Sequence, residues 1–126
     1  MPIIKITYPK HLNLGMPSLS VACNKKILQE IVAHKALGTA DTSHCNIFYF
    51  KAENNIDTVL VEITIDKTRN LQLKTLNTLK SIVVENILCV LGKIPVKQNI
   101  KILAQVEFFD PKKGKFGWTT YRPEKK

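Results

Sequence analysis

The spacing of the hydrophobic residues changes from that of a strand to that of a helix and back to that of a strand. This order occurs twice along the chain. Ile3–Tyr8 is a short run of β-branched and aromatic side chains that Pro9 ends. Apolar residues then recur at helical spacing in a segment that Ser18 or Ser20 can cap. A second β-rich run follows at His44–Phe50. The first half of the chain is therefore predicted to form a strand, a helix and a strand.

The first helix is expected to extend to about Leu37, where Gly38 favours its end. Its buried stripe is predicted to consist of Leu19, Ala22, Ile27, Ile31 and Val32. After the second strand, Asn54-Asn55 marks a turn. This turn separates the first half of the chain from a second half with the same plan.

The second half begins with a clear alternation across Thr58–Asp66. The residues expected on one face are Val59, Val61, Ile63 and Ile65, and those on the other are Leu60, Glu62 and Thr64. Asn70 is expected to cap the next helix and Gly92 to end it, with Pro95 preventing continuation. The apolar positions of this helix are Leu76, Leu79, Val83, Ile87 and Val90. The last strand, Ile100–Phe109, is predicted to turn to one face Ile102, Ala104, Val106 and Phe108.

The repeated order predicts the topology of one sheet. A strand, a helix and a strand cross over right-handedly, so each unit is expected to pair its two strands in parallel. Ile4–Thr7 is similar to Val61–Thr64, which favours an internal structural repeat. We expect an α/β (α+β) domain over 1–111, with repeats at about 1–53 and 57–111. The two units would make one four-stranded sheet with both helices on one face.

The sheet face away from the helices is predicted to be mixed in character. Its expected residues are Leu60, Glu62, Thr64, Lys101, Leu103, Gln105, Glu107 and Phe109. This set is too apolar for comfortable exposure and too polar for a dry core. It suits an oligomer interface that encloses some water, and a solvated face is the alternative.

The net charge of +9 is concentrated at the C-terminal end. Residues 112–126 form a basic tail whose six basic residues and Glu124 give +5, so the preceding residues carry only +4. Such a tail can attract nucleic acid, acidic lipid or an anionic ligand, or it can be a solvated segment. Trp118, Tyr121 and Arg122 suit packing on a neighbouring subunit, and a flexible tail with one packed tryptophan is the alternative.

No segment is predicted to cross a membrane. The longest run without a charged residue or histidine is Leu12–Asn24, which contains Asn, Ser, Gly and Pro. It is shorter than the roughly 20 apolar residues that a membrane span requires. The N-terminal residues lack the basic region and apolar run of a signal peptide. A soluble, cytoplasmic protein is expected.

The cysteines and histidines are not spaced as a disulfide framework or as metal ligands. The cysteines are odd in number without a close pair, and each is expected to be a small buried hydrophobe: Cys23, Cys45 and Cys89. No HxxxH or HExxH spacing occurs among His11, His34 and His44. Neither a disulfide nor a metal site is expected.

Two folds share this order of elements. One is the ferredoxin-like sandwich, which includes RNA-recognition domains with stacking aromatic residues and glycine on the third strand. The third predicted strand here, Val59–Ile65, has no aromatic residue and no glycine. The third strand therefore offers no ring on which a base could stack. Only the basic tail still favours nucleic-acid binding by this protein. The N-terminus indicates the second fold.

The chain begins Met1-Pro2, and a small second residue normally permits removal of the initiator methionine. Removal would leave Pro2 with a free secondary amine, whereas retention of Met1 would make the same nitrogen an amide without basicity. A free α-amine has a reference pKa near ~8, which desolvation and a nearby cation both lower. A base tuned near neutral pH can take a proton α to a carbonyl and return it elsewhere. The alternative is that Pro2 merely follows the start codon.

Three short motifs give this chain a family resemblance. They are Pro2–Ile6 at the first strand, Lys67–Leu71 before the second helix, and Glu107–Pro111 at the end of the last strand. With its length and element order, the chain resembles the 5-carboxymethyl-2-hydroxymuconate isomerase family of the tautomerase superfamily. This resemblance implies a tautomerase-like fold, a homotrimer, and catalysis without a cofactor or a metal.

The resemblance also implies roles for two residues. Pro2 matches the catalytic base of that family, and Arg69 matches an arginine that binds a substrate carboxylate. Arg69 precedes a predicted helix, whose unpaired backbone N–H groups and dipole also favour an anion. A plain surface charge is the alternative for Arg69.

One part of the sequence departs from the family pattern. The family has a second arginine near the start of the second strand, where this chain has Asp41–Cys45. His44 would supply a weaker, pH-dependent donor, or it makes an ordinary structural hydrogen bond. Without the second arginine, a monocarboxylate, another keto–enol substrate and a lost activity all stay open.

The sequence therefore predicts a cofactor-independent keto–enol tautomerase or isomerase that acts on a small unsaturated or 2-oxo carboxylate. Pro2 would be the acid/base and Arg69 the carboxylate clamp. The competing hypothesis is a non-enzymatic α/β module that binds nucleic acid through its basic tail. Activity on an enol favours the first, and steeply salt-dependent nucleic-acid affinity favours the second.

Overall fold

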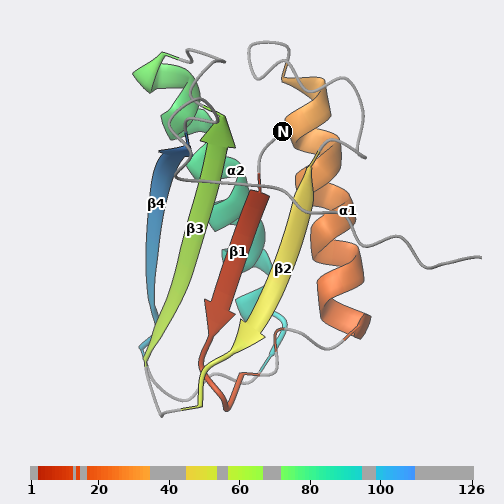
Figure 1. The fold of residues 1–126 in the computed structure, drawn as a ribbon. Helices are drawn as coiled ribbons and strands as arrows, with labels where there is room; N and C mark the ends of the chain where they lie inside the picture. Colours follow the sequence, from red (N-terminus) through yellow and green to blue (C-terminus); the bar gives the residue numbers. More distant parts are fainter. Residues whose placement is uncertain are drawn as a thin grey trace, which may run out of the picture.

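The computed structural model describes residues 3–12, 14, 17–34, 45–53, 57–66, 72–94 and 99–109. In chain order, the elements are β1 (Ile3–Tyr8), α1 (Pro17–Ala33), β2 (Asn46–Lys51), β3 (Thr58–Asp66), α2 (Leu73–Leu91) and β4 (Lys101–Phe109). The predicted order of strand, helix and strand, given twice, is confirmed in these residues (Figure 1).

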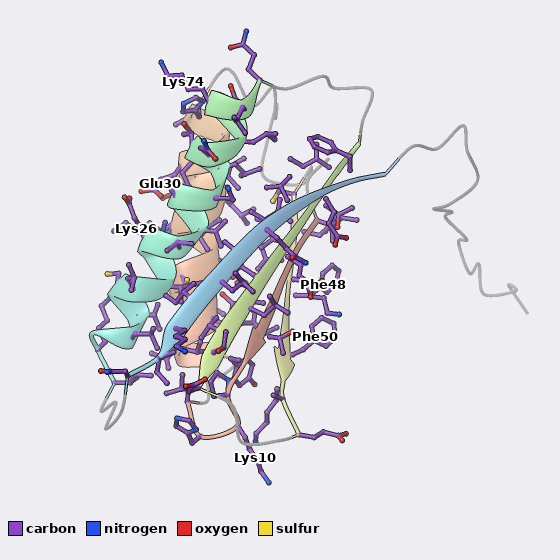
Figure 2. The ribbon with its side chains drawn as sticks, turned by 90° about the vertical axis from the view of Figure 1, so that its left-hand side faces the viewer. Lys10, Lys26, Glu30, Phe48, Phe50 and Lys74 are labelled. Carbon is purple, nitrogen blue, oxygen red and sulfur yellow. The ribbon has the colours of Figure 1, made fainter. Side chains whose placement is uncertain are left out.

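The strands form one four-stranded sheet in the order β2-β1-β3-β4. β1 pairs with β2 in parallel, β3 pairs with β4 in parallel, and the central strands β1 and β3 are antiparallel. Both helices lie on the same face of this sheet, which Figure 2 shows from the side. The predicted α+β fold with both helices on one face is therefore confirmed.

The strand pairing decides between the two folds that share this element order. In the ferredoxin-like fold another strand is inserted between the two strands of each unit. Here β1 and β2 are direct neighbours through all six residues of each strand, and β3 and β4 are neighbours along nine. The ferredoxin-like alternative is therefore excluded.

The core lies between the sheet and the helices. Alternate residues of a strand point to opposite faces, so the helix side receives every second side chain. On β1 these are Ile4 and Ile6, and on β3 they are Val59, Val61, Ile63 and Ile65, all almost inaccessible to solvent. The predicted alternation of β3 is confirmed. Removing these aliphatic side chains from water is the main force that holds helices and sheet together.

The predicted apolar stripe of α2 is also confirmed, because Leu76, Leu79, Val83, Ile87 and Val90 are all buried. Asn86 is buried within the same face and satisfies its amide inside the protein. Its Nδ2 donates to the carbonyl of Ile82 at 2.7 Å and to Oε2 of Glu30 on α1 at 2.7 Å. The second of these hydrogen bonds ties the two helices together.

The predicted C-terminal end of α2 is confirmed, and its predicted N-terminal end is wrong. Gly92 ends the helix as expected, and its N–H donates to the carbonyl of Leu88 at 3.0 Å. The start was wrong: Gln72 is the N-cap, with extended backbone, and its carbonyl accepts the N–H of Leu76. Asn70 comes two positions too early to be the cap, and it lies outside the described residues.

Helix α1 differs from its prediction at both ends. It begins at Pro17, which suits a first helical turn because the missing N–H is not needed there. Ser18 and Ser20 therefore lie inside the helix instead of capping it. The helix ends at Ala33 and not at Leu37, after a tight turn in which the N–H of His34 donates to Ile31. Gly38 lies outside the described residues.

Three further expectations need correction. Ala22 is exposed, and Cys23 takes its place on the buried stripe, four residues before Ile27. Cys89 is exposed, while the other two cysteines are buried as predicted. Strand β2 starts two residues later than His44. None of the helices in the described part of the chain is both long and apolar enough to cross a membrane.

Candidate active site

Several chain segments converge at one edge of the sheet. Ile3 opens β1 and pairs with Asn46 at the start of β2 and with Thr64 near the end of β3. The last pairs of β3 with β4 place Asp66 beside Phe109. We call this end of the sheet, where β1 and β2 begin and β3 and β4 finish, the β1-start edge. It lies at the top of Figure 1.

Both helices also reach the β1-start edge with one end (Figure 1). Helix α1 ends there with Ala33, and α2 begins there with Leu73. The N-cap Gln72 makes no side-chain capping hydrogen bond, and the first turn of α2 contains no acidic residue. Unpaired N–H groups and the helix dipole give such a terminus a positive potential, which favours an anion.

The three residues singled out from the sequence lie outside the described residues: Pro2, His44 and Arg69. Their nearest described neighbours all belong to the β1-start edge. Pro2 directly precedes Ile3 of β1, His44 precedes Cys45, and Arg69 follows the end of β3 at Asp66. The topology thus brings together the described segments that flank Pro2, His44 and Arg69, which the sequence analysis proposed as a base, a donor and a cation. The tail residues Trp118, Tyr121 and Arg122 are likewise outside the described part.

Cys45 is a buried residue at this edge and directly precedes β2. Its side chain is 5% exposed and belongs to the hydrophobic core. Burial raises the pKa of the Cys45 thiol to about 11, so the group is uncharged at neutral pH. The sequence predicted its burial but gave no reason to place it in a site. The missing signal was the strand register, which only the structure provides.

His34 is a second group at this edge that the sequence did not assign to a site. It directly follows α1, and its Nδ1 atom is buried without a hydrogen-bond partner. A buried polar atom without a partner is costly in a folded protein and is common near functional sites. Its spacing from the other histidines had excluded metal binding and suggested nothing else. Among the described residues, no three His, Cys, Asp or Glu side chains are grouped as metal ligands.

The sheet face away from the helices carries aromatic residues that the sequence analysis missed. Phe48 and Phe50 of β2 are 49% and 47% exposed, and Leu103 of β4 is 55% exposed. The Nζ atom of Lys5 lies 4.9 Å from the ring centroid of Phe50. Figure 2 shows both labelled rings on the side opposite the helices. The alternation within β2 would have revealed them. We call Lys5, Phe48, Phe50, Glu62 and Leu103 the outer-face cluster.

A polar group is partly buried between β2 and α1. The Tyr49 hydroxyl donates to Oδ1 of Asn24 at 2.7 Å, and burial raises the pKa of this phenol and of the nearby Cys23 thiol. A cavity of about 10 Å³ lies beside them, lined by Leu14, Leu19, Cys23, Tyr49, Ile87 and Val90. A space of this size holds at most one water molecule, so it is not a substrate site.

Comparison with known proteins identifies the class of fold. No protein-family model and no curated protein matches this chain. The crystal structure of 5-carboxymethyl-2-hydroxymuconate delta-isomerase is similar over 100% of this chain and 89% of that one, with a TM-score of 0.64 and 12% identity. The crystal structure of Pt0534 inactivated by 2-oxo-3-pentynoate is similar over 93% of this chain and 89% of that one, with a TM-score of 0.53 and 13% identity.

These similarities establish the fold. The chain has a tautomerase-like α+β fold, and the resemblance stated from its sequence is confirmed at that level. At 12% and 13% identity, the similar proteins do not assign an activity or a site to this chain. Function therefore has to be argued from the residues at the β1-start edge.

Proposed function

We propose that this protein is a cofactor-independent keto–enol tautomerase or isomerase for a small unsaturated or 2-oxo carboxylate. The observation that carries the proposal is the β1-start edge, which gathers the segments next to Pro2, His44 and Arg69. The fold shared with a known isomerase supports the same reading. In this proposal Pro2 is the acid/base of the reaction.

The chemistry assigned to Pro2 needs a free, uncharged amine. Removal of Met1 would provide the free amine. Two described residues beside the start of β1 are uncharged: Ile4 is fully buried, and the buried Cys45 thiol keeps its proton at neutral pH. Such surroundings disfavour an ammonium ion and lower the pKa of an amine. The nitrogen then takes the enol hydroxyl proton, and the ammonium that forms returns a proton to the substrate carbon.

The carboxylate of the substrate is assigned to the region before α2. Arg69 would bind it in a two-pronged contact that lysine cannot reproduce. The uncapped first turn of α2 adds N–H groups and a positive potential at the same edge. His44 is proposed as a weaker second donor. With Arg69 as the one arginine assigned to the substrate, a monocarboxylate is the favoured substrate.

The outer-face cluster supports the homotrimer as part of this proposal. Phe48, Phe50 and Leu103 are about half-exposed, and burying such side chains between copies of the chain would stabilise an assembly. Lys5 and Glu62 are register partners on this face, so polar groups would enter the interface as a pair of opposite charge. Sedimentation equilibrium should give three times the chain mass, and Phe48→Asp should give the monomer. A stable wild-type monomer would contradict the trimer.

Covalent labelling provides the direct test of the proposed base. A conjugated 2-oxo-3-alkynoate such as 2-oxo-3-pentynoate can accept the free amine at its β-carbon. The nitrogen–carbon bond forms as one π bond of the alkyne breaks, the proton released by nitrogen ends on the carbon α to the ketone, and no group leaves. Intact mass should rise by one inactivator, and peptide mapping should place it on Pro2. Labelling should abolish turnover of phenylenolpyruvate.

The exposed Cys89 thiol is an alternative nucleophile, so the experiment is repeated with Cys89→Ala. The label and the inactivation should both persist in that variant. A label found only on cysteine, or an unlabelled and inactive wild type, would contradict the proposed function. Salt-dependent RNA or DNA affinity in such an inactive protein would favour the nucleic-acid module instead.

A further inference from the structure

We propose that strand β4 is a docking edge for a second copy of this chain, and that two β4 strands pair antiparallel about a two-fold axis at Ala104. The inference goes beyond the proposed function, because it concerns association and needs no residue of the proposed site. Three observations carry it: an open and regular strand edge, apolar side chains left partly uncovered at that edge, and a charge order that complements itself when the strand is reversed.

The open edge is the first observation. Within the described chain, β4 (Lys101–Phe109) pairs with β3 alone, and we call its other side the β4 edge. The pairing with β3 keeps one offset through nine residues, so no bulge bends the strand. Edge strands are usually short, or carry proline, bulges or charges, because their unpaired backbone groups otherwise attract another strand. The stretch Ile102–Val106 has neither proline nor charge, and β4 is longer than the six-residue edge strand β2.

The cover of the side chains is the second observation. On β3 the residues that face the helices are almost fully buried, whereas the corresponding residues of β4 are only partly buried: Ile102, Ala104 and Val106. Phe108 has the same alternation and is 47% exposed. Pairing with a further strand would remove part of this apolar surface from water, which favours association.

Helix α2 continues this apolar surface. Asn86 faces α1, because it donates to Glu30, and Leu88 comes two residues later, about 200° around the helix. Leu88 therefore points away from α1, and it is 53% exposed. Figure 1 shows β4 at the side of the sheet remote from α1, so Leu88 lies on the side of the β4 edge. A second copy across this edge would bring its own α2, with its own Leu88, to the same side.

The order of charges along β4 is the third observation. Residues directly opposite in an antiparallel pair share a face, and opposite charges there stabilise the pairing. An axis at Ala104 sets Lys101 of each copy opposite Glu107 of the other, which makes two such pairs. An axis at Leu103 would set Lys101 opposite Gln105, and an axis at Gln105 would set Glu107 opposite Leu103. Charge complementarity therefore selects Ala104.

Both charged side chains are accessible to a partner. Lys101 and Glu107 are exposed, and Glu107 accepts one long hydrogen bond, from Gln105 at 3.4 Å. A two-fold axis makes the contact self-complementary and closed, so it joins two units and stops. Phe48 and Phe50 of the outer-face cluster belong to the opposite edge strand and stay uncovered. The contact can therefore join two single chains or two of the proposed trimers, and the mass doubles in either case.

Charge reversal tests the complementarity. In sedimentation equilibrium, the mass of the wild-type chain at high loading concentration should be twice its mass at low concentration. Lys101→Glu and Glu107→Lys should each weaken this association by about 10-fold or more, because like charges then lie opposite each other. The double variant restores opposite charges and should associate like wild type. Lys26→Glu, at an exposed position on α1, is the matched control. A wild-type mass that does not double, or reversals no weaker than the control, would overturn the inference.

Disulfide trapping tests the position of the axis. Ala104→Cys in a Cys89→Ala background should give a covalent dimer with oxidised glutathione. The two thiols lose two protons and two electrons, and one oxidised glutathione becomes two reduced molecules. Opposite Cα atoms in an antiparallel pair are about 4.5–5.5 Å apart, within the range that a disulfide needs. Val21→Cys, at an exposed apolar position on α1, is the control and should give no comparable dimer.

A mixture of Lys101→Cys and Glu107→Cys chains, in the same background, tests the register. The mixture should form a bridge between the two different chains, and the remaining Lys101 and Glu107 keep one charge pair. Each variant alone should form none, because identical positions would lie about 20 Å apart. No bridge in the mixture, or equal bridging by each variant alone, would overturn the register. If Ala104→Cys does not fold, the mixture decides the inference by itself.

Discussion

The two edges of the sheet differ in how completely their polar groups are paired. At the edge where β1 and β2 end, the N–H of Ala52 donates to Tyr8 at 2.9 Å, and the N–H of Lys101 donates to Asp57 at 2.8 Å. Segments at this edge are closed by hydrogen bonds that the chain makes with itself.

The β1-start edge is different within the residues that the structure describes. The first turn of α2 has no side-chain cap, and Nδ1 of His34 is buried without a partner. Natural proteins satisfy most buried polar groups, and the exceptions concentrate where function requires them. This difference supports the proposal that the β1-start edge binds an anion and moves a proton.

Replacing Pro2, the proposed base at the β1-start edge, should have the largest effect on activity. Pro2→Ala replaces the cyclic secondary amine with a primary one, and kcat/KM for phenylenolpyruvate should fall by about 10²- to 10⁴-fold. Stability should be unchanged, because no described core contact is removed. Steady-state kinetics and urea unfolding measure the two effects. A variant with full turnover would show that the amine is not the base.

Removing the proposed clamp should have the next largest effect. Arg69→Ala loses a charge-assisted contact to the carboxylate, and KM should rise by about 10- to 100-fold with a smaller change in kcat. Lys26→Ala removes one positive charge from an exposed position on α1 and serves as the control. Equal kinetic effects of the two substitutions would reduce Arg69 to a surface charge.

The buried thiol at the β1-start edge predicts a pH dependence of stability. The pKa of Cys45 is raised from 9.0 to about 11 by burial. Between these values the unfolded thiol has lost its proton while the native thiol keeps it, so stability falls as pH rises through that range. Urea unfolding of wild type and Cys45→Ala should show a steeper decline for wild type. Parallel curves would mean that the thiol is not buried.

The smallest effect is expected away from the β1-start edge, in the middle of β2. Tyr49→Phe removes the hydrogen bond to Asn24 and should lower the free energy of unfolding by about 1 kcal/mol. Turnover should be the same as wild type, since Tyr49 lies in the middle of β2, away from the β1-start edge. A loss of turnover without a loss of stability would mean that the two edges do not divide their tasks in this way.

Much of this fold follows from local sequence patterns. The alternation in Thr58–Asp66 and the apolar spacing in α2 reflect directly which side chains leave water, so both were predicted correctly. Helix ends were predicted less well, because a cap such as Gln72 is chosen by backbone geometry and not by a favourable side chain. The exposure of Cys89 depends on which face of α2 meets the sheet, and its apolar neighbours in sequence gave the wrong answer.

The candidate site was less accessible to sequence reasoning. Pro2 and Arg69 came from a family resemblance and from the chemistry of an amine and a guanidinium. The convergence of their flanking segments depends on the register between strands far apart in the sequence.

The most direct test compares turnover of phenylenolpyruvate by two forms of the chain whose N-termini are verified by intact mass. One form begins with a free Pro2, and the other retains Met1 or an N-terminal extension. The account predicts turnover by the first form and none by the second, because an amide nitrogen cannot accept the proton. Equal turnover by the blocked form would contradict it.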